Sequence, residues 1–407
     1  MINRRLLLQR VLSVPFLGGF LGGLATGSGA ASPLTVARAA QRDYFQELGV
    51  RTFINAAGTL TSLSGSLMPD EVVDAIEYAR RHYVGLDEIQ DRVGERIAQL
   101  VRCESATVTS GAFSAMTLGL AGVMCGMDTE KVAQLPDVTG LKNEVIKLKS
   151  DHYIDYVHAL LNTGATVVEV GTLQELEDAI TERTAMLFVL NAYNGSEVGH
   201  EELVAVGKKH EIPTFNDCAA DVPPIENLWK YTDMGYDLVA FSGGKGIRGP
   251  QSAGLLLGRA DLIAAARLHT PPRGDTIGRG MKVNKEEVLA MLVALELYIE
   301  KDHAEEWRLW ETQIGHISDS ITTVPGAEAD YHVPEVANHV PTLTITWDQS
   351  RIPIAPEEAK RRLREGHPSI ETGGGSDGLS LSTWMMRPGE ERVVARRIRE
   401  ILTEASS

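Results

Sequence analysis

Short apolar segments alternate with longer amphipathic segments through the middle of the chain, and this alternation limits the possible folds more than any other feature. Residues 185–190 form a continuous apolar run, typical of a strand that is buried on both faces. Strands that alternate with helices of about 10–15 residues form βαβ units and a mostly parallel sheet. Further strands are predicted at residues 105–109, 144–149, 166–169, 213–216, 238–241 and 254–257.

Helices are predicted between these strands and after them. A long helix is expected over residues 284–301, where apolar residues recur at near-helical spacing, and it would join a large domain to a smaller one. Two strands, at residues 342–347 and 379–383, and a final helix at 390–403 predict that the smaller domain is α+β. The other predicted helices are residues 113–124, 154–163, 173–181 and 201–210.

A lysine in a glycine-rich loop is the strongest chemical signal. The segment Phe241-Ser-Gly-Gly-Lys-Gly-Ile-Arg-Gly-Pro250 places Lys245 just after a predicted buried strand. Glycines let a cofactor approach the backbone closely, and a lysine in such a loop can form an imine. Ser242 could donate a hydrogen bond to a phosphate. The loop alone is equally compatible with an ordinary surface lysine.

Two further strand ends carry residues that suit pyridoxal 5′-phosphate (PLP). Asp217 follows the predicted strand upstream of Lys245, and PLP needs a carboxylate beside its pyridine nitrogen so that the ring can act as an electron sink. Thr107-Val-Thr-Ser-Gly-Ala-Phe-Ser114 is a turn of small residues before a predicted helix. Such a turn presents backbone N–H groups and the positive end of a helix dipole to a phosphate. Either feature alone is a weak signal.

The order of these features resembles the fold-type I PLP enzymes. More narrowly, it is similar to the branch that contains bacterial selenocysteine synthase and D-glucosaminate-6-phosphate ammonia-lyase. Further matching segments are Ile54-Asn-Ala-Ala-Gly-Thr59, Gly164-Ala-Thr-Val-Val-Glu-Val-Gly171 and Gly278-Arg-Gly-Met-Lys-Val-Asn-Lys-Glu286. The resemblance implies an aspartate-aminotransferase-like α/β fold. Its large domain (41–285) would hold a mostly parallel seven-stranded sheet, and its small C-terminal domain (286–407) would be α+β.

The resemblance assigns roles to individual residues. Lys245 would carry PLP as a Schiff base and move the Cα proton of the substrate, and Asp217 would pair with the pyridine nitrogen. The phosphate would be held by Ser110, Gly111, Ala112 and Ser242. His152 would stack on the cofactor ring; the alternative is a histidine at a helix start. Asn194 would reach the cofactor O3′ or the substrate; the alternative is a plain turn.

Three basic residues are candidates for binding an anionic substrate. Selenocysteine synthases resemble the segment with Arg279 and Lys282 but carry two arginines there, which bind an anion in the active site. A lysine supplies charge without the bidentate fork of an arginine. Arg387 is a candidate carboxylate ligand from the small domain, and the alternative for the pair is a solvated basic loop. We therefore predict a small amino substrate with an anionic group, and no metal site.

The first 40 residues resemble an export signal. Arg4 and Arg5 precede an apolar, glycine-rich run over residues 11–24, and small residues lead to an A-x-A cleavage site that ends at Ala39. Paired arginines are typical of a twin-arginine signal, which exports folded proteins. We expect cleavage after Ala39 and a periplasmic protein without a membrane segment. The alternatives are an uncleaved anchor, or a cytoplasmic protein if the signal interpretation is wrong.

Charge and cysteine content narrow the possible partners. The formal net charge is −16, and it is about −20 without the four arginines of residues 1–40. Such a surface repels nucleic-acid phosphates and argues against a tRNA substrate, as does a signal-like segment where selenocysteine synthase has its tRNA-binding domain. The three cysteines, Cys103, Cys125 and Cys218, form no C-x-x-C pair, and we expect them to be reduced and mostly buried.

These features together predict a PLP-dependent lyase. It would remove the α-proton of an amino acid or amino-sugar acid and eliminate a β-substituent. An aminotransferase or a racemase needs the same lysine and aspartate, so both remain alternatives. A third alternative is a non-catalytic exported binding protein, against which the intact Lys245, Asp217 and phosphate turn argue. Because fold-type I sites are completed by a neighbouring subunit, the resemblance also implies a homodimer or a larger even assembly.

Overall fold

The computed structural model describes residues 42–152 and 155–406, and the chain divides into two compact units, residues 1–51 and 52–407. In the first unit, helix α1 (Tyr44–Leu48) is capped by Asp43, whose carboxylate accepts a hydrogen bond from Gln46 N at 2.9 Å. The predicted export signal lies outside the described residues, so twin-arginine export stays a prediction. Within residues 42–152 and 155–406, no helix has the length and apolar content that a membrane span needs.

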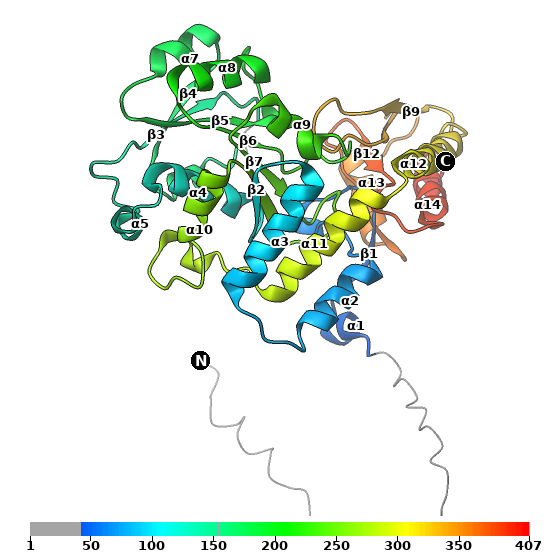
Figure 1. Ribbon diagram of the computed structural model, residues 1–407. Helices are drawn as coiled ribbons and strands as arrows, with labels where there is room; N and C mark the ends of the chain where they lie inside the picture. The colour runs from blue at the N-terminus through cyan, green and yellow to red at the C-terminus, as the bar shows by residue number, and fades with distance from the viewer. Residues whose placement is uncertain (1–41, 153–154, 407) are drawn as a thin grey trace, which may run out of the picture. The chain divides into compact units, whose positions relative to one another are not determined.

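A seven-stranded sheet organises the second unit (Figure 1). Its strand order is β2-β8-β7-β6-β5-β3-β4, and β8 is the one strand among these seven that runs in the opposite direction to the others. This confirms the predicted mostly parallel sheet and all seven of its predicted strands. The strands are β2 (Ser105–Thr109), β3 (Glu144–Leu148), β4 (Thr166–Val170), β5 (Thr184–Leu190), β6 (Thr214–Asp217), β7 (Leu238–Ser242) and β8 (Gly254–Gly258).

An apolar core lies on each face of this sheet. Leu187 and Val189 of β5 belong to one core, and Phe188 and Leu190 belong to the other, as the alternation of side chains along a strand requires. Helices α3 and α11 contribute to the first core, and α4 and α10 to the second. The helices around the sheet are α2 (Asp70–Ala79), α3 (Leu86–Val101), α4 (Ala112–Cys125), α5 (Thr129–Gln134), α6 (His158–Leu161), α7 (Leu173–Ala179), α8 (His200–His210), α9 (Asn227–Met234), α10 (Ala260–Leu268) and α11 (Lys285–Glu300).

One predicted helix, over residues 154–163, is wrong in its first part. Helix α6 covers only His158–Leu161, and residue 154 lies outside the described residues. Tyr156 has a φ of 52°, which a right-handed helix does not accept. The chain therefore approaches α6 through a loop, and this loop carries the Tyr156 side chain.

The predicted helix over residues 284–301 is present as α11. The Asn284 side chain accepts a hydrogen bond from Glu287 N at 2.8 Å, and the Glu287 carboxylate accepts one from Asn284 N at 3.2 Å. This reciprocal capping box fixes where the helix begins. Helix α11 packs against α2 and α3, on the face of the sheet where those helices lie.

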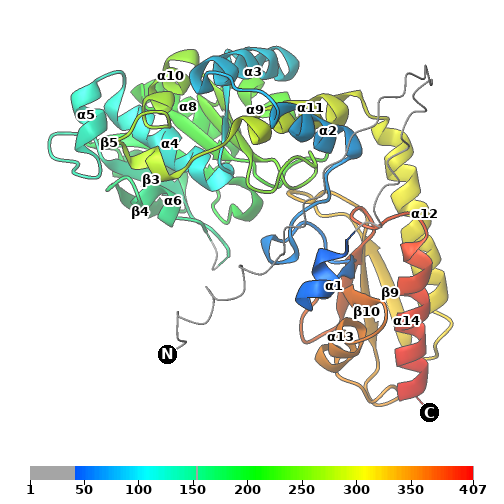
Figure 2. The same cartoon turned by 90° about the horizontal axis from the view of Figure 1, so that it is seen from below.

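A second sheet lies in the C-terminal part, beside α12 and α14 (Figure 2). Its antiparallel order is β12-β10-β9, which confirms the predicted small C-terminal sheet. Strand β1 (Phe53–Asn55) pairs in parallel with β11 (Ser369–Glu371), and Ile54 is buried in the C-terminal core. The domain limit at residue 285 stays a prediction. The other elements are α12 (His303–Ile321), β9 (Ala327–His332), β10 (Thr342–Trp347), α13 (Pro356–Arg364), β12 (Leu379–Ser382) and α14 (Glu390–Ala405).

Candidate active site

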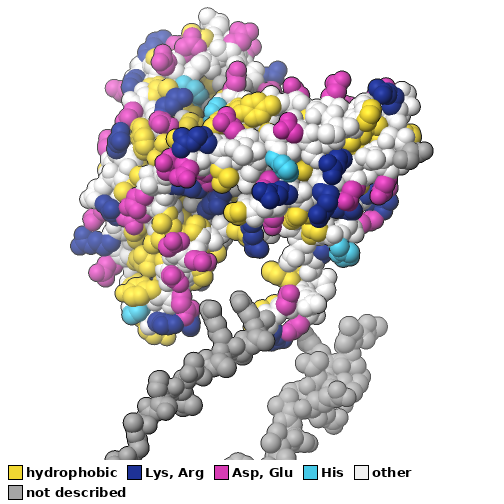
Figure 3. Space-filling view, turned by 90° about the vertical axis from the view of Figure 1, so that its right-hand side faces the viewer, with side chains coloured by type: hydrophobic (Ala, Val, Ile, Leu, Met, Phe, Trp, Pro, Cys, Tyr) yellow, Lys and Arg dark blue, Asp and Glu magenta, His cyan; other side chains and the backbone are white. Residues whose placement is uncertain are grey.

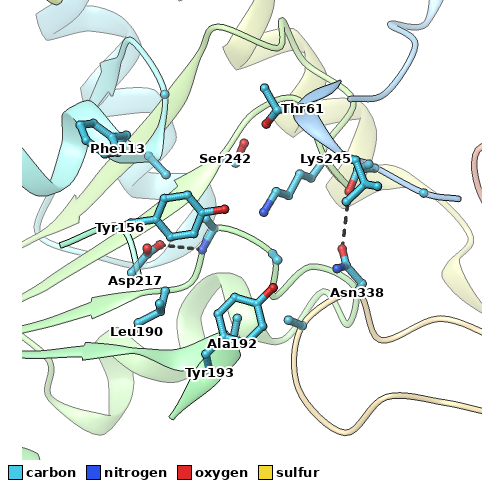
Figure 4. Close-up of a pocket in the computed structure, with 18 of the residues that line it drawn as sticks. Thr61, Phe113, Tyr156, Leu190, Ala192, Tyr193, Asp217, Ser242, Lys245 and Asn338 are labelled. Atoms are coloured by element: carbon cyan, nitrogen blue, oxygen red, sulfur yellow. Dashed lines mark hydrogen bonds between the residues drawn. The ribbon is translucent and has the colours of Figure 1, made fainter. Parts of the chain in front are cut away.

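The carboxyl ends of β5, β6 and β7 meet at one cavity of about 330 Å³ (Figure 4). Asp217 ends β6, Ser242 ends β7, and Lys245 follows in the next loop; all three line the cavity. Parallel α/β sheets bind ligands at this edge. The remaining walls come from residues 57–61, from the start of α4, and from the C-terminal residues Ala337, Asn338 and Trp384.

Lys245 extends into the cavity, where its ammonium group lies among neutral and acidic side chains (Figure 4). Burial lowers the pKa of this ammonium group, and the carboxylates of Asp217 and Asp221 oppose that change. A lysine with a lowered pKa is more often neutral at physiological pH. Its Nζ can then act as a nucleophile and as a proton acceptor.

Asp217 is a buried carboxylate beside this lysine. Its side chain is almost fully enclosed, and it accepts a hydrogen bond from Ala219 N at 3.0 Å. Burial raises the pKa of Asp217 to about 6, while the bond from Ala219 and the charge of Lys245 act in the opposite direction. A buried carboxylate is stabilised by a cationic partner. A protonated pyridine nitrogen would be such a partner.

A second buried acid, Asp221, lies four residues further along. Its Oδ2 accepts a hydrogen bond of 2.5 Å from Asn191 Nδ2, which also lies 2.8 Å from the Tyr231 hydroxyl. Burial raises the pKa of Asp221, and hydrogen bonds from Asn191 and Cys218 lower it. This acid was not predicted from the sequence, although it follows Asp217 by only four residues in the loop after β6.

The turn between β2 and α4 has the features of a phosphate cradle. Gly111 precedes α4 with a φ of 87°, and no side chain caps the helix. The backbone N–H groups of the first helical turn are therefore free for an anion. Gly254 lies against this turn, since an added Cβ would come within 2.6 Å of the Gly111 carbonyl carbon. Gly111 and Ala112 line the cavity, whereas the Ser110 hydroxyl donates to Ser114 Oγ at 2.9 Å.

Two predicted cofactor ligands, His152 and Asn194, do not belong to the cavity wall. The His152 ring stacks on Tyr193, with centroids 4.3 Å apart and planes inclined by 15°, and Tyr193 lines the cavity. Asn194 Oδ1 accepts hydrogen bonds from Ser196 N at 3.1 Å and from Ser196 Oγ at 2.7 Å. These bonds form a local turn. The cofactor roles of His152 and Asn194 stay predictions.

The three predicted anion ligands are exposed. Arg279 lies in a short 3-10 helix (Ile277–Gly280), Lys282 follows it, and Arg387 follows β12; none of them lines the cavity. Among the described residues that form the cavity wall, Lys245 is the one positive side chain. The roles of Arg279, Lys282 and Arg387 in substrate binding stay predictions.

Several aromatic residues of the cavity wall were missed by sequence analysis. Tyr156 and Tyr193 lie in the loops after β3 and β5, and an aromatic residue in a strand-end loop is a signal that could have found them. Phe113 lies in the first turn of α4. Trp384 comes from the C-terminal part, and nothing in the sequence links it to the strand ends of the large sheet.

The fold and this site define a class of protein. A mostly parallel seven-stranded sheet, a small C-terminal sheet, and a lysine and an aspartate at adjacent strand ends form an aminotransferase-like scaffold. An alanine–glyoxylate aminotransferase from Nostoc sp. shares the fold, with a TM-score of 0.55 at 16% identity over 88% of this chain and 96% of that one.

Comparison with known proteins narrows this class to a family. The family model of L-seryl-tRNA selenium transferase (SelA) matches residues 53–310. The chain therefore belongs to the L-seryl-tRNA selenium transferase family, whose members are PLP-dependent.

Two relatives match over most of their length. The D-glucosaminate-6-phosphate ammonia lyase of Salmonella typhimurium is 28% identical over 377 residues, which cover 89% of this chain and 98% of that protein. A 5′-C-glycyluridine monooxygenase-decarboxylase of a Streptomyces species is also 28% identical, over 88% of this chain and 92% of that protein. The solved structure of a D-glucosaminate-6-phosphate ammonia-lyase has a TM-score of 0.79 at 26% identity and covers 90% of this chain and all of that one.

The raised pKa of Asp217 predicts how the stability of the apoprotein depends on pH. Because the folded state holds this proton up to about pH 6 and the unfolded chain releases it near about pH 3.9, ionisation of Asp217 destabilises the fold as pH rises through this interval. We expect the Asp217→Asn apoprotein to be more stable than the parent above pH 6, by up to about 3 kcal/mol, in urea unfolding.

The difference between the two apoproteins should fade as pH falls below about 4, because Asp217 then becomes protonated in the unfolded state as well as in the folded state. Asp137→Asn is the control, because hydrogen bonds from Thr139 lower the pKa of that exposed carboxylate. We expect this control substitution to give no gain at neutral pH. A stability gain for Asp217→Asn that is constant with pH would contradict the raised pKa of Asp217 in the folded state.

Proposed function

We propose that this chain is a PLP-dependent lyase that acts on an amino acid or an amino-sugar acid. The proposed reaction removes the Cα proton, eliminates a β-substituent and releases ammonia. The observation that carries the proposal is the similarity to a D-glucosaminate-6-phosphate ammonia lyase, which extends over 98% of that protein. The cavity supports it, because Lys245, Asp217 and the turn at Gly111 converge there.

The residues of the cavity fit PLP. The uncapped start of α4, with Gly111 and Ala112, and the Ser242 hydroxyl suit its phosphate. Buried Asp217 suits its pyridine nitrogen, and Lys245 Nζ would hold it covalently. When bound, PLP supplies an electron sink for the negative charge that develops at Cα.

The chain's own residues would then move protons. Lys245 Nζ, with its lowered pKa, is the candidate base for the Cα proton. For a substrate with a β-hydroxyl group, the C3–O bond breaks and water leaves. A proton then adds at C3, one water adds at C2, and the C2–N bond breaks so that ammonia leaves. The net products are a 2-oxo-3-deoxy acid and ammonia, with no other reactant consumed.

A second candidate reaction is an oxidative decarboxylation. The relative named as a monooxygenase-decarboxylase is as similar to this chain as the ammonia lyase is, 28% in each case. Such a reaction would consume molecular oxygen and release carbon dioxide. The two candidates therefore differ in reactants and products, and an assay can separate them.

Lys245 is expected to be the attachment point of the cofactor. The purified protein with added PLP should show a visible absorbance band that borohydride abolishes, and Lys245→Ala should lack this band. Lys142→Ala removes an exposed lysine that does not line the cavity, and it should keep the band. A parent protein that stays colourless with PLP would instead support the binding-protein alternative.

The lyase reaction is expected to yield ammonia and a 2-oxo acid in equal amounts. D-glucosaminate-6-phosphate, D-glucosaminate and D-serine would be tested with the PLP-loaded protein, without a 2-oxo acid acceptor and without oxygen. A requirement for an acceptor would indicate an aminotransferase, and an inverted product that keeps its nitrogen would indicate a racemase. In a parallel assay under air, oxygen consumption with release of carbon dioxide would favour the monooxygenase-type reaction.

We also propose that the protein forms a homodimer or a larger even assembly and acts on a small molecule. Large apolar side chains are exposed along residues 60–84. This segment begins with Leu60 and Thr61, which line the cavity, so a second subunit that binds here could complete the site. These side chains are Leu60, Leu67, Met68, Val73, Tyr78, Tyr83 and Val84. The acidic net charge, and a face on which basic and acidic side chains are interspersed, argue against nucleic acid (Figure 3).

Light scattering is expected to give at least a dimeric mass for the parent. Val73→Asp should shift this mass toward the monomer, because it places a charge among the exposed apolar side chains. Val336→Asp changes a valine of similar exposure, 47% against 45%, outside residues 60–84, and it should leave the mass unchanged. A monomeric parent would contradict the proposed assembly.

A further inference from the structure

Arg248 has a backbone conformation that favours glycine. It lies three residues after Lys245, between Ile247 and Gly249, and its φ is 59°. A residue with a Cβ is strained in this left-handed region. Strain of this kind clusters at functional sites, where the side chain has a role that a glycine would not supply.

The Arg248 side chain connects the Lys245 loop to the C-terminal part of the chain. Its Nη2 donates a hydrogen bond of 2.6 Å to the Trp384 carbonyl oxygen. The same Nη2 lies 3.8 Å from Glu306 Oε1, and Glu306 also forms an ion pair with Lys301. A guanidinium group that donates to a carbonyl across two parts of a fold fixes their relative position.

Trp384 forms a wall of the cavity that contains Lys245. Its side chain is 3% exposed, and it packs edge-on against Trp310, with ring centroids 6.4 Å apart. It also lies against Gly58, where an added Cβ would be 3.3 Å from Trp384 Nε1. The indole is thus held through its ring by two neighbours and through its backbone by Arg248.

A second contact of the same kind supports this arrangement. Asn338, another cavity residue, has a φ of 44°, and its N–H donates to the Ala220 carbonyl at 2.7 Å. Ala220 follows Asp217 in the loop after β6, as Arg248 follows Lys245 in the loop after β7. The loops after β6 and β7 therefore each hold the C-terminal wall of the cavity by a hydrogen bond. In each bond one partner is a non-glycine residue with a positive φ, Arg248 in the loop after β7 and Asn338 in the wall.

We infer that Arg248 is a positioning residue that holds the Trp384 indole as a wall of the substrate cavity. It acts through the Trp384 carbonyl and so limits the space that a substrate side chain has beside Lys245. The inference rests on the proposed function for the presence of a substrate. The contact between Arg248 and Trp384 can be tested without substrate or cofactor.

The first experiment measures acrylamide quenching of indole fluorescence in the apoprotein. Arg248→Met keeps the bulk and the strain but removes the donor, whereas Arg248→Gly removes both the donor and the strain. Each should raise the quenchable fraction of the fluorescence, and W384F in the same chain should remove the increase. Arg248→Lys keeps a donor and should lie closer to the parent. If R248M does not fold, R248G decides by the same criterion.

Arg102 offers a matched control. Its φ is 60°, and its guanidinium group lies 4.4 Å from the centroid of the Trp229 ring, among residues that do not line the cavity. Arg102→Met should expose Trp229, and W384F should not remove that increase. Unchanged quenching in both Arg248 variants, or an increase that W384F leaves intact, would overturn the inference.

The second experiment uses the PLP-loaded protein and hydroxylamine, which displaces a lysine from PLP and removes the visible band. Loss of a charge-assisted hydrogen bond predicts a rate about tenfold higher in R248M and R248G, and no change in R102M. In a W384A background the Arg248 substitutions should add nothing, because the wall is already gone. Parent rates in both variants, or an equal increase in the W384A background, would overturn the positioning role.

A parent without the band would refute the proposed function alone, and the quenching result would still decide the role of Arg248.

Discussion

Three parallel strands that end side by side determine the chemistry of this protein. In the register of β5, β6 and β7, Leu190 pairs with Asp217, and Asp217 pairs with Ala240, so the loops after these strands start at the same edge of the sheet. The strands themselves are buried, and this edge is consequently poor in water. Burial disfavours a charged side chain in such an environment, so the pKa values of Asp217 and Lys245 both move toward the neutral forms, and the attraction between the two charges only partly opposes this change. A lysine and an acid at an exposed edge would lack this property.

Much of the scaffold was predictable because it depends on local patterns. The apolar runs of the large sheet, the turn at Gly111 and the strand-end positions of Asp217 and Lys245 can be read from short segments, and the structure places them around one cavity. The cap at Asn284 is also local, since it needs only Glu287 three residues later. The seven strands and their mostly parallel arrangement follow from the same patterns and from the rules that connect βαβ units.

The other features depend on contacts between distant segments or on single backbone angles. The left-handed φ of Tyr156 shortened a predicted helix, and no pattern of neighbouring residues indicated it. Trp384 lines the cavity only because the C-terminal part folds back over the strand ends. Asp221 was missed because its importance comes from burial and from Asn191, thirty residues earlier in the chain. Exposed Arg279 and Lys282 show the converse: a segment that matches the family does not by itself place a side chain in the cavity wall.

The pairing of β1 with β11 has a consequence for biosynthesis. Phe53, Ile54 and Asn55 lie at the start of the second unit, and their partners Ser369, Ile370 and Glu371 follow 316 residues later. During translation, β1 therefore has no partner until the ribosome has added the whole large sheet and most of the C-terminal part. The C-terminal core, which includes Ile54 and Ala56, cannot close before β11 has been made. A nascent chain must therefore keep the buried residue of β1, Ile54, without its final contacts for most of the time that this unit is being synthesised.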